Sequence, residues 1–268
     1  MKVLYFTATG NSLYVAKRLA DRQGVGEQGE LLSIPRLMKM GVTSLEDDRI
    51  GIVCPCYFLG TPDIVMEFLR KVRLRASYIF AVMTYGGFPG EGVGHLVRMA
   101  ERAGIRIDYS NQILMVDNYL PMFDIAREIR EEPNKHSEEH LESILHDIRN
   151  TRRSHPARNP IMRVISFFAL KSKEWMMGGK CRNFWITEAC NGCGICVEVC
   201  PVDNIRLDPQ PVFNDGCIYC MACINLCPIN AIQSKRQKSK DRFMNRNVTL
   251  GEIKEANRTV DKSNGISI

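Results

Sequence analysis

Eight of the eleven cysteines lie in one stretch, residues 190–228, and their spacing is that of metal ligands. The stretch contains CNGCGICVEVCP and then CIYCMACINLCP, so that both runs follow the pattern CxxCxxCxxxCP. A shift of 27 residues superimposes the first run on the second. Thiolates are the ligands that iron–sulfur chemistry requires, and two runs of this form predict two 4Fe-4S clusters.

In this pattern three cysteines of a run hold one cluster, and the fourth cysteine holds the other. We therefore expect the first cluster on Cys190, Cys193, Cys196 and Cys227. We expect the second cluster on Cys217, Cys220, Cys223 and Cys200. Zinc is the main alternative for paired cysteines, but a structural zinc site uses four ligands in two pairs and would leave cysteines of each run unused.

A small, hydroxyl-rich turn follows the first expected strand, residues 2–6, and precedes a helical pattern at residues 13–22. The turn consists of Thr7, Ala8, Thr9, Gly10, Asn11 and Ser12. Free N–H groups at a helix N-terminus, together with hydroxyl groups, bind phosphate. A simple helix cap is the alternative, although a cap needs fewer such residues. The turn lacks the lysine of a P-loop and the spaced glycines of a dinucleotide site, which argues against ATP and NAD.

Strand and helix patterns alternate through the first half of the chain. We expect further strands at residues 30–34, 49–54, 78–83 and 111–116, and helices at 61–72 and 92–103. This alternation predicts a parallel sheet with helices on both faces. Residues 124–153 are highly charged, with apolar residues on one helical face, and are expected to form the last outer helix.

Two loops after expected strands, PCYFLGTP at residues 55–62 and TYGGFPG at 84–90, combine aromatic side chains with glycine. Ligands of parallel sheets bind outside the carboxyl ends of the strands. Such loops suit a flat ring that lies between side chains while backbone groups approach its edge. Either loop alone could be an ordinary turn, but the phosphate-binding turn at the same edge favours a ligand with a phosphate and a ring.

FTATGNS, PCYFLGTP and TYGGFPG resemble the phosphate loop and the two ring-binding loops of flavodoxins, a resemblance that covers residues 1–150. It implies noncovalent FMN and a doubly wound, five-stranded parallel sheet of order 2-1-3-4-5. The turn from Thr7 to Ser12 would hold the phosphate. The residues implied around the ring are Pro55, Cys56, Tyr57, Phe58, Thr84, Tyr85, Gly86 and Gly87. Flavodoxins often have Trp in the first wall, and here Phe58 or Tyr57 must take its place.

The order of the two parts resembles the fused flavodoxin–ferredoxin proteins of anaerobic bacteria and archaea. The resemblance implies an α/β flavodoxin-like domain at residues 1–150 and a small α+β two-cluster ferredoxin domain at 181–233. Residues 151–180 form a basic connector, and we expect its apolar residues to pack between the domains: Ile161, Val164, Phe167, Phe168, Leu170 and Trp175. Residues 234–268 are expected to be a solvated basic tail, with a short docked helix possible at 250–256.

Composition and charge bound the class of protein. Hydrophobic content of 45% and charged content of 25% are those of a soluble globular protein. No signal-peptide core or spanning apolar run is present, so we expect a cytoplasmic protein. Residues 234–268 hold nine Lys or Arg and four Asp or Glu, so nine minus four places +5 of the net +6 there. The nearly neutral remainder, with anionic clusters and flavin phosphate, argues against nucleic-acid binding.

Electron transfer is the expected function, because FMN exchanges two electrons and each cluster exchanges one, with redox proteins as partners. One alternative is an oxidoreductase that acts on a small molecule such as a quinone, with Tyr57, Tyr85 and His95 around the substrate. Another is a redox sensor or a subunit of a larger complex, docked through the tail. We expect Cys54, Cys56 and Cys181 to be packing residues, and His95 to lie on a helix surface unless it donates protons.

Overall fold

The computed structural model describes residues 1–157, 159–177 and 180–258. For residues 174–177 and 180 it describes the backbone alone. The first half forms a sheet of five parallel strands: β1 (Lys2–Tyr5), β2 (Glu30–Ser33), β4 (Arg49–Pro55), β6 (Tyr78–Tyr85) and β7 (Tyr109–Leu114). The strand order is β2-β1-β4-β6-β7, which is 2-1-3-4-5 when these strands are counted along the chain. The predicted sheet is therefore confirmed.

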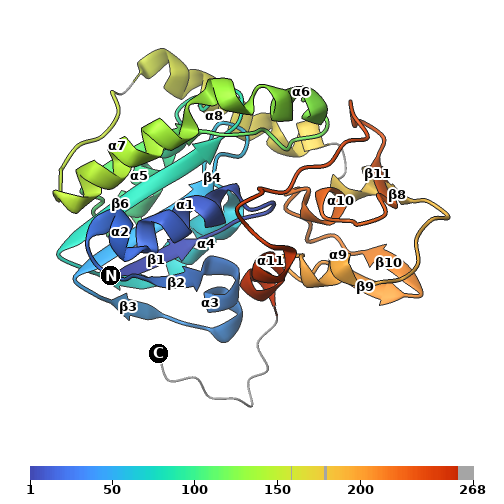
Figure 1. Cartoon of the computed structure of the whole chain (residues 1–268), viewed down its shortest axis with the longest axis horizontal. Coiled ribbons are helices and arrows are strands. Elements are labelled where there is room, and N and C mark those ends of the chain that lie inside the picture. Colours follow the sequence, from blue (N-terminus) through green and yellow to red (C-terminus); the bar gives the residue numbers. More distant parts are fainter. Residues whose placement is uncertain (158, 178–179, 259–268) are drawn as a thin grey trace.

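Helices cover both faces of this sheet (Figure 1). One face carries α1 (Asn11–Ala20), α2 (Arg22–Val25) and α7 (Ser137–Arg149). The other carries α3 (Ile34–Met40), α4 (Asp63–Lys71) and α5 (Gly92–Arg102). Successive strand residues point to opposite faces, so Val3 and Tyr5 join the first core while Leu4 and Phe6 join the second. Helix α3 and a short parallel pair, β3 (Ser44–Glu46) and β5 (Arg73–Arg75), were not predicted.

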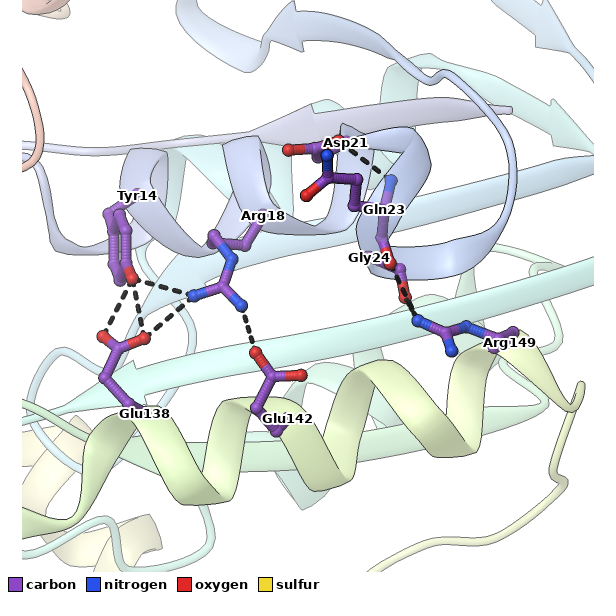
Figure 2. Close-up of polar contacts among 8 residues, drawn as sticks. All are labelled: Tyr14, Arg18, Asp21, Gln23, Gly24, Glu138, Glu142 and Arg149. Atoms are coloured by element: carbon purple, nitrogen blue, oxygen red, sulfur yellow. Dashed lines mark hydrogen bonds and ion pairs between the residues drawn. The ribbon is translucent and has the colours of Figure 1, made fainter.

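Polar contacts fix α1 and α2 against α7 (Figure 2). The Arg18 guanidinium donates to the Glu138 carboxylate at 2.9 Å, and the Tyr14 hydroxyl donates to the same carboxylate at 2.8 Å. Arg149 donates to the carbonyl oxygen of Gly24 at 2.6 Å. A Cβ at Gly24 would lie 2.2 Å from the Arg18 carbonyl oxygen, so this close approach requires glycine. These contacts hold α1, and with it the turn at its N-terminus, in place.

After α7 the chain forms a long helix, α8 (Pro160–Met177), that packs on the sheet domain. The Ser166 hydroxyl is buried and accepts the backbone N–H of Glu91 at 2.9 Å. Leu170 lies directly on Gly60, where a Cβ would be 2.8 Å from the leucine methyl carbon. Lys173 forms an ion pair with Asp63. One face of α8 is thereby fixed to the loops at the carboxyl edge of the sheet.

The opposite face of α8 is exposed, which contradicts the prediction that the apolar residues of the connector pack between the domains. Ile161, Val164, Phe167 and Phe168 are 68%, 56%, 55% and 63% exposed. They do not pack between the domains, and only Leu170 of the predicted patch is half-buried. The Trp175 side chain lies outside the side chains that the structure describes. Among the described residues, no helix has the length and apolar composition needed to cross a bilayer.

The carboxyl-terminal part is a small α+β unit beside the sheet domain, coloured orange to red in Figure 1. It contains η2 (Lys180–Asn183), β8 (Phe184–Ile186), α9 (Ile195–Glu198), β9 (Ile205–Asp208), β10 (Gln210–Phe213), α10 (Ala222–Asn225) and β11 (Ile232–Ser234). Strand β8 pairs antiparallel with β11, and β9 pairs with β10. A shared core joins this unit to the chain after β7, including Val116, Leu120 and α6 (Ile125–Arg130). A short 3-10 turn, η1 (Glu132–Lys135), separates α6 from α7.

The expected solvated tail is instead packed between the two domains. We call residues 238–257 the C-terminal segment. The Phe243 N–H donates to the Asn225 side chain at 3.1 Å, and the Asn245 N–H donates to the Thr9 carbonyl oxygen at 2.8 Å. Helix α11 (Leu250–Asn257) confirms the helix expected at residues 250–256 and contacts both α3 and α9. The solvated-tail prediction is wrong here because Phe243, Val248 and Ile253 are buried within a sequence that is basic on average.

The ends of α11 carry ion pairs to both domains. Lys17 of α1 pairs with Glu252 at 2.6 Å, and Lys254 pairs with Glu198 of α9 at 2.6 Å. These exposed pairs contribute little individually, so we attribute the docking mainly to the buried apolar side chains.

We predict that Phe243→Ala lowers the free energy of unfolding by about 3 kcal/mol, because it empties a buried aromatic site. Phe243 is 5% exposed, whereas its neighbour Met244 is 38% exposed. The matched control Met244→Ala is expected to cost less than about 1 kcal/mol. Urea unfolding followed by circular dichroism measures both values, and equal losses would show that the segment is not packed as described.

Candidate functional site

A cavity of about 370 Å³ lies at the carboxyl edge of the sheet. Its size is within the range of small-molecule sites. Every residue predicted to contact the cofactor lines it, except Gly10. These are Thr7, Ala8, Thr9, Asn11, Ser12, Pro55, Cys56, Tyr57, Phe58, Thr84, Tyr85, Gly86 and Gly87. The structure thus brings three separate loops together around one space, while the binding of a flavin there stays a prediction.

The turn at residues 7–12, which is predicted to bind phosphate, is held in place by contacts of its own side chains. Gly10 is the N-cap of α1, and no side chain caps this helix end. The Asn11 amide donates to the Val116 carbonyl oxygen at 2.9 Å, and the Ser12 and Thr84 hydroxyls lie 2.9 Å apart. The alternative that Asn11 or Ser12 serves as the helix cap is therefore wrong. The first-turn N–H groups of α1 keep the capacity to bind an anion.

Gly10 faces away from the cavity, toward the C-terminal segment. Its φ of 104° lies in the left-handed region, and a Cβ there would be 2.9 Å from Cβ of Asn245. The Asn245 amide also donates to the Asn11 side-chain oxygen at 3.0 Å. Gly10 therefore serves the docking of the C-terminal segment behind the turn rather than the lining of the cavity.

The first predicted ring wall is a tight turn under backbone strain. Tyr57 and Gly60 exchange two backbone hydrogen bonds of 2.9 Å. Between them Phe58 and Leu59 have φ values of 50° and 61°. Such a conformation normally selects Asn or Gly and costs about 1–2 kcal/mol for each other residue. The Tyr57 hydroxyl is buried and has no hydrogen-bond partner among the described residues, so the wall contains a polar group that a ligand would satisfy.

The second predicted ring wall, the loop at residues 84–90, contains two glycines that a neighbouring loop requires. A Cβ at Gly86 would lie 2.2 Å from the Asp117 side chain, and one at Gly87 would lie 2.9 Å from Phe123. The absence of side chains at these glycines therefore allows the loop after β7 to pack against the second wall. This role is separate from the predicted close approach of their backbone to a ring. The loop contributes further cavity residues that the sequence analysis missed: Val116, Asp117, Asn118, Tyr119, Met122 and Phe123. The rule that ligands lie at carboxyl strand ends applies equally to this fifth strand and would have identified it.

The cysteine-rich unit supplies part of the same cavity. Tyr219, Cys220 and Met221, all within the second cysteine motif, line it together with Ala169 of α8. The Tyr219 ring stacks on Phe184 at a centroid distance of 5.6 Å and meets Tyr119 edge-on at 6.0 Å. A predicted cluster ligand therefore lies in the wall of the predicted flavin site.

The predicted ligands of the first cluster lie around one space. Cys190, Cys193, Cys196 and Cys227 line a single small cavity. Burial, and to a smaller extent Cys193 and Cys227, raise the pKa of Cys196 to about 11. Of these four residues Cys193 is exposed.

The predicted ligands of the second cluster are also neighbours and lie deeper. Burial raises the pKa of Cys223, and the nearby thiols of Cys220, Cys217 and Cys200 raise it further. No group of three or more His, Cys, Asp or Glu among the described residues is arranged as the ligands of a single metal ion. A cubane cluster does not need that arrangement, because each thiolate binds a different iron. The donor set fits two clusters, and the assignment of individual ligands stays a prediction.

Backbone N–H groups point at the fourth cysteine of each motif. The N–H of Asn204 donates to Cys200 Sγ at 3.2 Å, and the N–H of Ala231 donates to Cys227 Sγ at 3.2 Å. The two contacts are related by the internal repeat, since each joins a cysteine to the residue four positions later. Hydrogen bonds to the sulfurs raise the reduction potential of a cluster.

Three further residues considered in the sequence analysis, His95, Cys54 and Cys181, do not line the cavity. His95 accepts the Thr61 N–H at its Nδ1, at 3.2 Å, and burial lowers its pKa to about 4. It is half-buried on α5 and is not placed to donate a proton into the cavity. Cys54 is fully buried in β4, and the Cys181 thiol donates to the Asn214 carbonyl oxygen at 3.2 Å. Cys56 does line the cavity, and burial raises its pKa to about 12, so its thiol is neutral.

Comparisons with known proteins bear on both parts of the chain. The family model of the 4Fe-4S dicluster domain (Fer4_7) matches residues 189–231. The chain is similar to the two-electron reduced flavodoxin of Megasphaera elsdenii, at 16% identity over 42% of this chain and 84% of that chain, with a TM-score of 0.32.

It is also similar to the Trp repressor binding protein of Bacillus subtilis, at 10% identity over 55% of this chain and 95% of that chain, with a TM-score of 0.34. A comparison with curated proteins returned no match. The fold of the first half rests on its strand order rather than on these likenesses. The chain thus combines a flavodoxin-like sheet and a 4Fe-4S dicluster domain in one polypeptide, which makes it a redox protein.

Proposed function

We propose that the protein transfers electrons between a noncovalently bound FMN in the large cavity and two 4Fe-4S clusters in the carboxyl-terminal unit. The observation that carries this proposal is the place of Tyr219, Cys220 and Met221 in the cavity wall. A ligand of the second cluster borders the flavin site directly, so the two cofactors would lie next to each other without an intervening domain surface.

FMN supplies the exchange between two-electron and one-electron chemistry, and each cluster carries one electron. The chain's own residues bind and orient these groups. The turn at α1 offers N–H groups and hydroxyls to the phosphate, and the first and second walls hold the ring beside Cys220. The exposed first motif, with Cys193 at the surface, is where we place electron exchange with partner proteins. Eleven cysteines without a described disulfide suit the reducing cytoplasm, where we place the protein.

The cavity is nearly free of charged groups. Asp117 is the one carboxylate among the described residues that line it, and no Lys or Arg of these residues does so. The Asp117 carboxylate accepts the Tyr119 N–H at 2.8 Å and lies against Gly86. Burial, and then the nearby Glu128, raise the pKa of Asp117 to about 6. A phosphate is therefore bound by neutral donors, and the charge beside the second wall is negative above about pH 6.

The cofactor content gives the first prediction that follows from the proposed function. Protein purified without oxygen is expected to contain about eight irons, about eight acid-labile sulfides and about one FMN per chain. Metal analysis, sulfide determination and the fluorescence of the released flavin measure these values. Zinc in place of iron, or protein that binds no FMN when it is added, would contradict the proposal.

The second prediction separates the two clusters. Cys220→Ala and Cys193→Ala should each leave about four irons per chain, because each removes one ligand of one cluster. With Cys193→Ala the flavin is expected to pass electrons to the remaining cluster as fast as in the wild-type protein. With Cys220→Ala this fast phase should disappear, because the cluster beside the cavity is lost. Stopped-flow absorbance and electron paramagnetic resonance follow the transfer, and the reverse pattern of rates would refute the order of the cofactors.

The third prediction concerns pH. Because the folded-state pKa of Asp117 lies above its ordinary value, the folded protein binds this proton more tightly than the unfolded chain. Above about pH 6 the ionised Asp117 carboxylate therefore lowers the free energy of unfolding. This loss disappears as the pH falls toward 4 and the carboxylate is protonated. Asp117→Asn in flavin-free protein should raise the unfolding free energy by roughly 2 kcal/mol at about pH 7.5 and roughly half as much near pH 5.

Asp124→Asn is the matched control for this experiment. Asp124 caps α6 by accepting the Arg127 N–H at 3.0 Å, a contact that asparagine also makes. Urea titrations at both pH values compare the two variants with the wild-type protein. A gain for Asp117→Asn that does not change with pH would show that the carboxylate is not buried as described.

A further inference from the structure

Helix α8 presents its apolar face to solvent. Ile161, Val164, Ile165 and Phe168 follow the spacing i, i+3, i+4 and i+7 and therefore form one stripe along the helix. All four are exposed, by 68%, 56%, 43% and 63%. Phe167, at 55% exposed, widens the stripe on one side. We call these five residues the α8 stripe. Single exposed apolar residues are ordinary, but a contiguous row marks an interaction surface.

The helix is held in this orientation by its contacts on the other side. The buried Ser166 hydroxyl accepts the Glu91 N–H at 2.9 Å, and Lys173 pairs with Asp63. Leu170 lies on Gly60, and Ser166 Oγ would be 2.6 Å from a Cβ at Gly90. Rotating α8 to bury its stripe would break these contacts. The exposure of the stripe is thus a property of the docked helix.

The charges around the stripe are positive. Residues 151–173 contain six Lys or Arg and no Asp or Glu. Arg152, Arg153 and Lys173 pair with carboxylates of the sheet domain. Among the described residues, Arg163 and Lys171 have no carboxylate partner, and the Lys171 ammonium lies 5.8 Å from the Phe167 ring centroid. Both flank the stripe and are exposed.

Apolar side chains also occur at the large cavity, both on α8 and on neighbouring loops. Ala169, next to Phe168 in sequence, lines the cavity, and so do Phe88 and Met122. Phe88 and Met122 are 55% and 57% exposed. The surface next to the cavity is therefore apolar on both α8 and the adjoining loops.

We propose that the α8 stripe, with Arg163 and Lys171, is a docking surface for an anionic lipid membrane. An apolar helix face bordered by cations matches the interface of such a membrane, where aromatic and branched side chains enter the acyl boundary and cations meet the headgroups. A second copy of the chain is a poorer occupant, because a symmetric contact would bring the same unpaired cations together. Docking through α8 places the rim of the cavity next to the lipid surface.

Vesicle binding by the full-length protein tests this surface. Vesicles of phosphatidylcholine with about 30% phosphatidylglycerol, and vesicles of phosphatidylcholine alone, are sedimented with the protein at low and high salt. We expect binding to the anionic vesicles that weakens as salt is added, and little binding to the neutral ones. Phe168→Ser should lower the partition coefficient by about tenfold, and the double substitution Arg163→Glu with Lys171→Glu should lower it at least as much.

Leu207→Ser is the matched control, since Leu207 is 43% exposed on the distant strand β9 and should bind like the wild-type protein. Thermal melting shows that each variant is folded. No binding of the wild-type protein to anionic vesicles would overturn the proposal. So would equal binding to neutral vesicles, or a wild-type dimer that Phe168→Ser converts to a monomer, which would assign the stripe to a second copy of the chain.

Discussion

The contact between the second cysteine motif and the carboxyl edge of the sheet determines how the two domains are arranged. Burial raises the pKa of Cys220 well above its ordinary value, so a thiolate at this position needs a compensating positive charge. Iron supplies such a charge, since metal binding stabilises deprotonated ligands. If Cys220 binds a cluster as proposed, docking of the domains and binding of that cluster stabilise each other. The stacked rings of Phe184 and Tyr219 lie at the same contact and add buried aromatic surface.

Local sequence patterns were sufficient for the sheet and for three of the loops that line the cavity. Buried strands such as residues 78–83 are continuous apolar runs, and the turns after them contain glycine and aromatic residues, so both features can be recognised from a few neighbouring positions. The wall formed by Tyr219 and Met221 could not be predicted in this way. It depends on which surface of one domain meets the other. The sequence around residues that are more than a hundred positions apart does not indicate that they are in contact.

Helix α8 shows that hydrophobic periodicity does not indicate whether an apolar helix face points inward or outward. The spacing of Ile161, Val164 and Phe168 indicates an apolar face but not the direction in which it points. An inward direction is the usual outcome, and the structure has the opposite one. Gly60 and Gly90 bring the loop backbones so close to α8 that Leu170 and the small Ser166 fit the contact, and the bulkier face is left outside. Packing geometry, and not hydrophobicity alone, decides which face of such a helix is buried.

The position of the C-terminal segment in the chain also determines when its contacts with the two domains can form. Chains emerge from the ribosome from the N-terminus, and domains fold as they appear. Asn245 and α11, which contact both domains, are synthesised after all the residues that they hold together. During translation the turn at residues 7–12 therefore lacks the support behind Gly10. Docking of the C-terminal segment against both domains is therefore completed only after translation has passed Asn257.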